Sequence, residues 1–199
     1  MLPLSWFRER LRASLAAAFA LAAWHAPGLA HTGADAGAHH GWLAGLLHPL
    51  TGLDHLAVMV AVGLWSALSA RQRWLAPLAF ASVLSLGALA AQAGLAVPLV
   101  EPMIAASLLV VGLLIAAHIA LPQGVVALLV AGFAWFHGAA HGQELSGLPA
   151  LAGMVVSTAL LHIAGIALGL ALQRWHAWAP RAAGAAVATV GVVSAAALW

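Results

Sequence analysis

The sequence predicts an all-α membrane protein, a six-transmembrane helix bundle that follows a cleavable signal peptide. Of the 199 residues, 64% are hydrophobic and 6% are charged, whereas a soluble domain contains about 25% charged residues. Six separate apolar segments are each long enough to cross a bilayer. These observations argue against a soluble globule, a disordered chain and a nucleic-acid-binding protein. Because cysteine is absent, the sequence also offers no disulfide framework and no thiolate metal site.

The first predicted element is a secretory signal peptide over residues 1–30. Three arginines in residues 8–12 precede an apolar run over residues 13–23, and Gly28-Leu29-Ala30 has the small-x-small pattern of a cleavage site. The apolar run spans about 16 Å as a helix, roughly half of the hydrocarbon core. The alternative is an uncleaved signal anchor. Cleavage after Ala30 would leave a single six-helix transmembrane domain, residues 31–199.

Six later segments are predicted to cross the bilayer. Each contains about 18 to 25 predominantly apolar residues, the length needed to span the hydrocarbon core. The segments are Leu53–Ala70, Trp74–Gly94, Pro98–Leu121, Gly124–His141, Pro149–Gln173 and Ala182–Trp199. Only short connectors remain, so the mature chain has no room for a separate soluble domain.

Charged residues predict the orientation of these spans. The connectors after the first and fifth spans contain all the arginines beyond the signal peptide: Arg71, Arg73, Arg174 and Arg181. The remaining acids fall in the opposite connectors or at the opposite helix ends: Asp35, Asp54, Glu101 and Glu144. Since arginine is enriched on the cytoplasmic side, the sequence predicts a multi-pass membrane protein whose mature N-terminus and C-terminus both lie on the outer side.

The first polar cluster, residues 48–55, lies just before and at the start of the first span. Pro49 and Gly52 predict a broken helix, which would free backbone groups to line a cavity. In a regular helix His48 and His55 would share a face, but the break leaves their geometry open. The alternative is that Asp54 caps the span and the histidines lie solvated at the interface.

The second polar cluster, residues 136–144, lies at the outer end of the fourth span. His137, His141 and Glu144 are spaced i, i+4 and i+7, so a continuing helix would place all three on one face. Imidazole and carboxylate without thiolate suit Ni²⁺, Co²⁺ or Zn²⁺. The spacing is similar to that of the metalloprotease helix, but Gly138 stands where a general-base glutamate is needed. The alternative is a pair of interfacial histidines at a helix end.

A further histidine, His162, is predicted near the middle of the fifth span. A polar side chain at that depth has no water to bind. Gly165 follows on the same face, which favours close packing, so His162 is predicted to point into the bundle. It would act there either as a transfer ligand for a cation or as a hydrogen-bonding group between helices.

The motifs resemble those of the HupE/UreJ family of bacterial nickel and cobalt permeases. The similar segments are His31-Thr32-Gly33, HPLTGLDHLAVMVAVGLW from His48 to Trp65, FHGAAHGQE from Phe136 to Glu144, and Leu161-His162 with Gly165. The resemblance implies secondary uptake of Ni²⁺ or Co²⁺ across the bacterial inner membrane, with the mature N-terminus in the periplasm. It implies these functional residues: His48, Asp54, His55, His137, His141 and Glu144. Either His31 or the extra His39-His40 pair would be the N-terminal ligand.

The predicted function is therefore uptake of a divalent metal ion, Ni²⁺ before Co²⁺, by a transporter rather than an enzyme. Inward movement of a divalent cation gains about 4.6 kcal/mol per 100 mV of membrane potential, so no pump is needed. The expected partners are the metal ion and the lipid bilayer, with no nucleic acid and no cofactor other than the transported ion, and the chain could form a homo-oligomer. Two alternatives stay open: an intramembrane metal-dependent hydrolase with Glu144 as ligand or base, and a metal sensor or binding subunit that does not transport.

Overall fold

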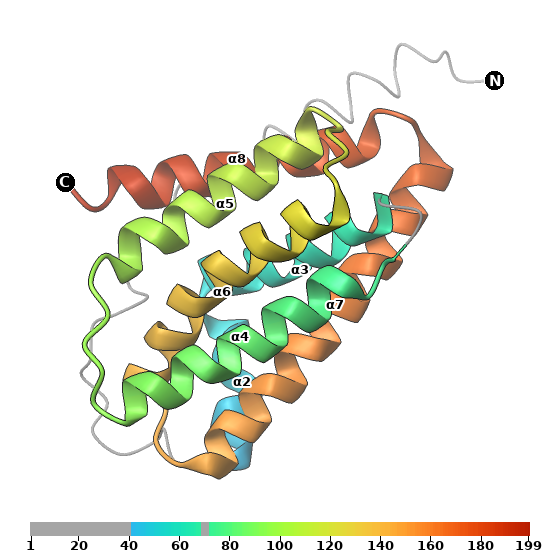
Figure 1. Cartoon of the computed structure of the whole chain (residues 1–199). Helices are drawn as coiled ribbons and strands as arrows, with labels where there is room; N and C mark the ends of the chain where they lie inside the picture. Colours follow the sequence, from blue (N-terminus) through green and yellow to red (C-terminus); the bar gives the residue numbers. More distant parts are fainter. Residues whose placement is uncertain (1–40, 69–71) are drawn as a thin grey trace. The chain divides into compact units, whose positions relative to one another are not determined.

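The computed structural model describes residues 41–68 and 72–199. The chain divides into two units, residues 1–32 and residues 33–199, and only the second contains described residues. The predicted signal peptide, His31 and the His39-His40 pair therefore lie outside the described residues. Every described element is a helix, as the sequence predicts (Figure 1).

The described part of the chain forms seven helices. They are α2 (Trp42–Thr51), α3 (Leu53–Leu68), α4 (Leu75–Gln92), α5 (Val100–Ala116), α6 (Gln123–Glu144), α7 (Leu148–Trp175) and α8 (Ala179–Ala196). Helices α3 to α8 occupy the six segments that the sequence predicts as spans. Helix α2 is additional, and it precedes the first predicted span.

Helix α5 is shorter than predicted because its C-terminus closes at Ala116. His118 has φ 57°, and the N–H of Ile119 donates to the carbonyl of Leu114 at 2.9 Å. A left-handed residue followed by a bond that reaches back five residues is a common way to end a helix. The chain then turns at Pro122, directly before α6.

Four described helices are long and apolar enough to cross a membrane individually: α4, α6, α7 and α8. The bent pair of α2 and α3 gives up to a fifth crossing. Helix α5 is apolar but has only 17 residues, which is about 26 Å of helix against a hydrocarbon core of about 30 Å. The count of six crossings therefore stays a prediction.

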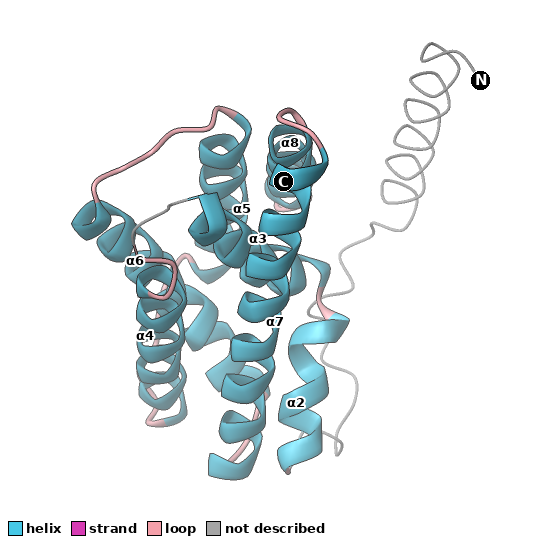
Figure 2. Cartoon of the chain, turned by 90° about the vertical axis from the view of Figure 1, so that its right-hand side faces the viewer, coloured by secondary structure: helices cyan, strands magenta, loops and turns pink. Residues whose placement is uncertain are grey.

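The helices pack mainly in four pairs: α4 with α6, α5 with α8, α3 with α7, and α2 with α7 (Figures 1 and 2). Glycines let these backbones approach closely. Gly63 of α3 faces Gly165 of α7, and a Cβ at Gly63 would lie 3.0 Å from the Gly165 Cα. Small residues are typical of helix contacts in membranes, where burying apolar surface brings no gain over lipid.

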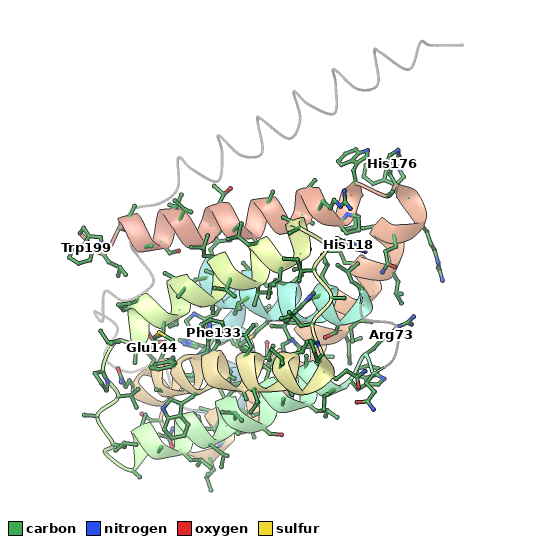
Figure 3. The ribbon with its side chains drawn as sticks, turned by 45° about the horizontal axis from the view of Figure 1, so that its top comes forward. Arg73, His118, Phe133, Glu144, His176 and Trp199 are labelled. Atoms are coloured by element: carbon green, nitrogen blue, oxygen red, sulfur yellow. The ribbon has the colours of Figure 1, made fainter. Side chains whose placement is uncertain are left out.

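The two ends of the helix bundle differ in the residues they present. Figure 3 shows Arg73, His118 and His176 at one end, and Glu144 and Trp199 at the other. Arg73 and Glu144 thus lie at opposite ends of the bundle, as the charge pattern predicts. The C-terminus lies at the end that contains Glu144, which we call the outer end; the opposite end is the inner end.

Candidate metal-binding site

A sharp break in the chain places the first polar cluster. Helix α2 ends at Thr51, α3 begins at Leu53, and their axes differ by 86°. The Thr51 hydroxyl donates to the carbonyl of His48 at 2.8 Å, which satisfies one acceptor in the last turn of α2. At the start of α3, the backbone N–H of His55 donates to Asp54 Oδ1 at 2.8 Å. The predicted broken helix is confirmed.

Helix α6 continues through Glu144, so the predicted helical spacing of the second cluster is also confirmed. A glycine follows each histidine in this stretch. Gly138 and Gly142 lie against the backbone of α4, where a Cβ would meet the carbonyl oxygens of Leu84 and Ala88. The glycines therefore let α6 press against α4, while His137 and His141 are fully buried in the bundle.

His48, His141 and Glu144 form a group of three metal-ligating side chains, which we call the outer triad. Each offers one ligand atom, and these atoms all lie within 4.8 Å of one another. The Nε2 of His48 and the Oε2 of Glu144 are 2.7 Å apart. Their side chains are 16% and 25% exposed, whereas His141 is buried. The outer triad thus has the donor set of a divalent-ion site with a partly open side.

His55 lies next to the outer triad, deeper in the bundle. Its ring centroid is 4.3 Å from that of His141 and 5.1 Å from that of His137. Its Nδ1 is 3.0 Å from Asp54 Oδ1, so the carboxylate accepts this N–H, and a neutral ring would then have its lone pair on Nε2. Carboxylates commonly orient metal-binding histidines in this way. Asp54 therefore contacts His55 and lies outside the outer triad.

The fourth histidine of the cluster, His137, is held by α5. Its Nε2 is 2.9 Å from the hydroxyl of Ser107, and its Nδ1 is buried with no hydrogen-bond partner among the described residues. Six of the sequence-predicted site residues thus meet in one cluster: His48, Asp54, His55, His137, His141 and Glu144. They come from α2, α3 and α6.

His162 lies apart from this cluster, on α7. Its Nδ1 donates to the carbonyl of Met59 at 2.7 Å, which is the predicted hydrogen bond between helices. Its Nε2 is buried and has no hydrogen-bond partner among the described residues. The ring of Phe80 is 5.1 Å from the His162 ring and 5.7 Å from the His137 ring. Phe80 therefore contacts both the cluster and His162.

Sequence reasoning missed three residues that contact the histidines: Met59, Phe80 and Ser107. Met59 contacts His162 through its backbone carbonyl, and Phe80 and Ser107 belong to helices with no polar motif. A serine within an apolar span is a weak signal, because Ser66, Ser85 and Ser157 share that context. Only the helix packing distinguishes Ser107 from them.

Comparisons with family models and with curated proteins give matches over most of the chain, whereas comparison with solved structures gives none. A model of the HupE / UreJ protein family matches residues 17–194. Protein HupE of Rhizobium leguminosarum bv. viciae is 41% identical over 178 residues, which cover 86% of this chain and 92% of that protein. No solved structure matches the chain.

Proposed function

The chain belongs to the HupE/UreJ family, and from this premise we propose that it takes up a divalent transition-metal cation, Ni²⁺ or else Co²⁺, across the bacterial inner membrane. The cation is the cargo, and the protein acts as a transporter rather than an enzyme. The observation that most supports this function is the outer triad, where two imidazoles and a carboxylate from two helices converge at one end of the bundle.

The chemistry of the outer triad suits capture of such a cation. Imidazole nitrogen and carboxylate oxygen bind borderline divalent ions, and the Irving–Williams order places Ni²⁺ above Co²⁺ at a given site of this kind. The partial exposure of His48 and Glu144 gives an ion access from solution. A cation bound by both residues would replace the hydrogen bond between them.

We infer an inward route from the outer triad through His55 and His137 to His162. The ring contacts of His55 with both His141 and His137 link the first steps. Beyond them, the Nδ1 of His162 donates its proton to the carbonyl of Met59. The neutral His162 ring therefore has its lone pair on Nε2, where it could bind a cation. A charge at this depth is costly without a ligand, and successive weak sites allow both entry and release.

The proposed topology has six crossings, with both mature termini in the periplasm. It is supported by the arginines at the inner end and the acids at the outer end. The outer triad then faces the periplasm, and a membrane potential that is negative inside drives the cation inward without ATP. Helix α2 would lie in the outer leaflet beside α7, where Gly153 faces the backbone of Trp42 and Leu46.

Metal accumulation in cells tests the proposal. Cells that express the wild-type chain should accumulate more Ni²⁺ or Co²⁺ than cells with an empty vector, and the Glu144→Gln variant should not. Gln143→Ala is the matched control, because Gln143 is the neighbouring residue but is exposed on another face of α6. Equal accumulation by the wild type and the empty vector at comparable protein levels would contradict transport.

Measurements on the purified protein, compared with metal accumulation in cells, separate the two other functions. A sensor or binding subunit would bind metal after purification without raising its accumulation in cells. A metal-dependent hydrolase would require a general base, and Glu144, the acid of the outer triad, would then act as base rather than as ligand. Release of product from a lipid or peptide substrate by the purified protein would favour that reading over transport.

A further inference from the structure

We propose that Ser107 is a positioning residue for cation transfer: its hydroxyl fixes the tautomer of His137 so that the Nδ1 lone pair is presented to the passing ion. This inference deepens the proposed function and depends on it for the identity of the ion. The hydrogen-bond geometry that supports it does not depend on transport.

The first step is the direction of the hydrogen bonds at Ser107. Its Oγ is 2.6 Å from the carbonyl oxygen of Ile104 in the preceding turn of α5. Two oxygens approach this closely only with a proton between them, and a carbonyl has none to donate. The single hydroxyl proton of Ser107 therefore points to Ile104.

The second step concerns His137, whose Nε2 is 2.9 Å from the same hydroxyl oxygen. Because Ser107 has no second proton, its oxygen acts as the acceptor and Nε2 as the donor. The neutral His137 ring then has its proton on Nε2 and its lone pair on Nδ1. A neutral imidazole binds a metal through its lone pair, and the hydrogen bond at the other nitrogen selects which atom is free to bind.

The third step is burial, which strengthens the preference for the tautomer with the proton on Nε2. Ser107 and His137 are both fully buried, so no bulk water competes for Nε2. The Nδ1 of His137 is buried and has no hydrogen-bond partner among the described residues. Leaving a buried acceptor unsatisfied is unfavourable, and such an atom in a native site calls for an explanation. A transient ligand role for Nδ1 supplies one.

The arrangement also explains what α5 adds to the site. Helix α5 contains no histidine, and its acid, Glu101, lies in its first turn. It packs against α6, the helix of His137, as well as against α8. Its contribution to the route is then a hydrogen bond that orients a ligand from another helix.

The tautomer of His137 can be measured directly by ¹⁵N NMR of the purified, histidine-labelled protein, since protonated and unprotonated ring nitrogens have well-separated shifts. The signal is assigned by its loss in His137→Gln. We expect the wild type to have its proton on Nε2. Ser107→Ala should shift the population toward the Nδ1-protonated form, and Ser107→Thr, which keeps the hydroxyl, should restore the wild-type signal.

Ser85→Ala is the matched control, because the Ser85 hydroxyl donates to the carbonyl of Ala81 in its own helix, as Ser107 does to Ile104. Ser85 has no hydrogen bond to any histidine within residues 41–68 and 72–199. Ser85→Ala should leave the His137 signal unchanged. In uptake assays at limiting Ni²⁺, Ser107→Ala should lower the initial rate by about 10- to 100-fold, the usual cost of losing an orienting partner. Ser107→Thr should recover most of that rate.

Two results would overturn the proposal: a wild-type His137 with its proton on Nδ1, or an unchanged tautomer in folded Ser107→Ala. Loss of uptake in Ser107→Ala with an unchanged tautomer counts against it as well, because the serine would then act only in packing. If the wild type transports no metal but the tautomer shifts in Ser107→Ala, the proposed function is wrong. The positioning of the His137 ring by Ser107 is then still supported.

Discussion

The outer and inner halves of the helix bundle differ in what they offer a cation. The outer half holds the outer triad with His55 and His137 beside it, and these side chains reach one another through hydrogen bonds and ring contacts. In the described inner halves of α3, α5 and α6, the buried residues are mostly apolar, among them Val62, Trp65, Val111, Ile115, Val126 and Val130.

This contrast indicates that the two halves have separate tasks. The donors that are gathered in the outer half suit the ion binding that we propose. The inner half would oppose passage of a divalent ion, because apolar side chains cannot replace the hydration shell of the ion. His162, with Phe80 against its ring, lies between the two. Binding and passage should therefore respond differently to substitutions in each half.

The largest expected effect is on metal binding by the outer half. His141→Ala removes a buried ligand, so Ni²⁺ affinity of the purified protein should fall by more than about 100-fold, since losing an orienting partner alone costs about 10- to 100-fold. Isothermal titration calorimetry measures this affinity. His176 is an exposed histidine at the inner end, and the His176→Ala variant should bind Ni²⁺ as the wild type does.

Uptake gives a second test of the same site. If the Asp54→Ala and Glu144→Ala variants both transport metal as the wild type does, the proposed site is wrong.

Single cysteines can test which half faces the periplasm. The chain has no cysteine, so each introduced thiol reports on one position. Leu148 at the start of α7 is 71% exposed, and Ile119 after α5 is 44% exposed. In spheroplasts, an impermeant maleimide should label Leu148→Cys and leave Ile119→Cys unlabelled until the membrane is opened. The reverse pattern would invert the proposed orientation, and labelling of both from outside would contradict a crossing by α6, the helix between the two positions.

The boundary between the halves should separate binding from uptake. His162→Gln keeps hydrogen-bonding capacity but supplies a poor nickel ligand, so we expect unchanged Ni²⁺ affinity at the outer triad. Uptake should fall by about tenfold, equivalent to about 1.4 kcal/mol on the barrier. Both quantities are measured on the same preparation, by calorimetry and in proteoliposomes. Wild-type uptake would leave His162 with its hydrogen bond to Met59 as its role.

The last prediction concerns stability rather than binding or uptake, through the helix contact that holds His162 in place. Gly63→Ala would put a Cβ against the carbonyl of His162 and 3.0 Å from the Cα of Gly165, so we expect a loss of about 1–3 kcal/mol in stability from overpacking. Gly132→Ala is the control, because a Cβ at Gly132 meets nothing within 4 Å. Thermal unfolding in detergent compares the two. Equal stability of both variants would show that the contact between α3 and α7 is loose.

Much of the outer site was predictable because its residues are close in sequence. The 137–141–144 spacing needs only a continuing helix, and Pro49 with Gly52 predicts a break before the first span. The contact of His48 with Glu144 spans 96 positions, and no local pattern encodes such a distance. Both motifs lie at predicted span ends on the same side of the membrane, which is compatible with their contact but does not determine which side chains pair.

The helical class, the family motifs and the six apolar segments could be predicted from the amino acids alone, because these depend on local composition and on motifs that are contiguous in the chain. The assembled bundle was needed to learn which helices pair, the 86° angle between α2 and α3, the membership of the outer triad and the contact of Ser107 with His137. Apolar helices in lipid are nearly interchangeable by hydrophobicity. Their partners are selected by the fit of glycines against opposing backbone and by hydrogen bonds between single buried polar atoms, and such interactions exist only once the helices are assembled.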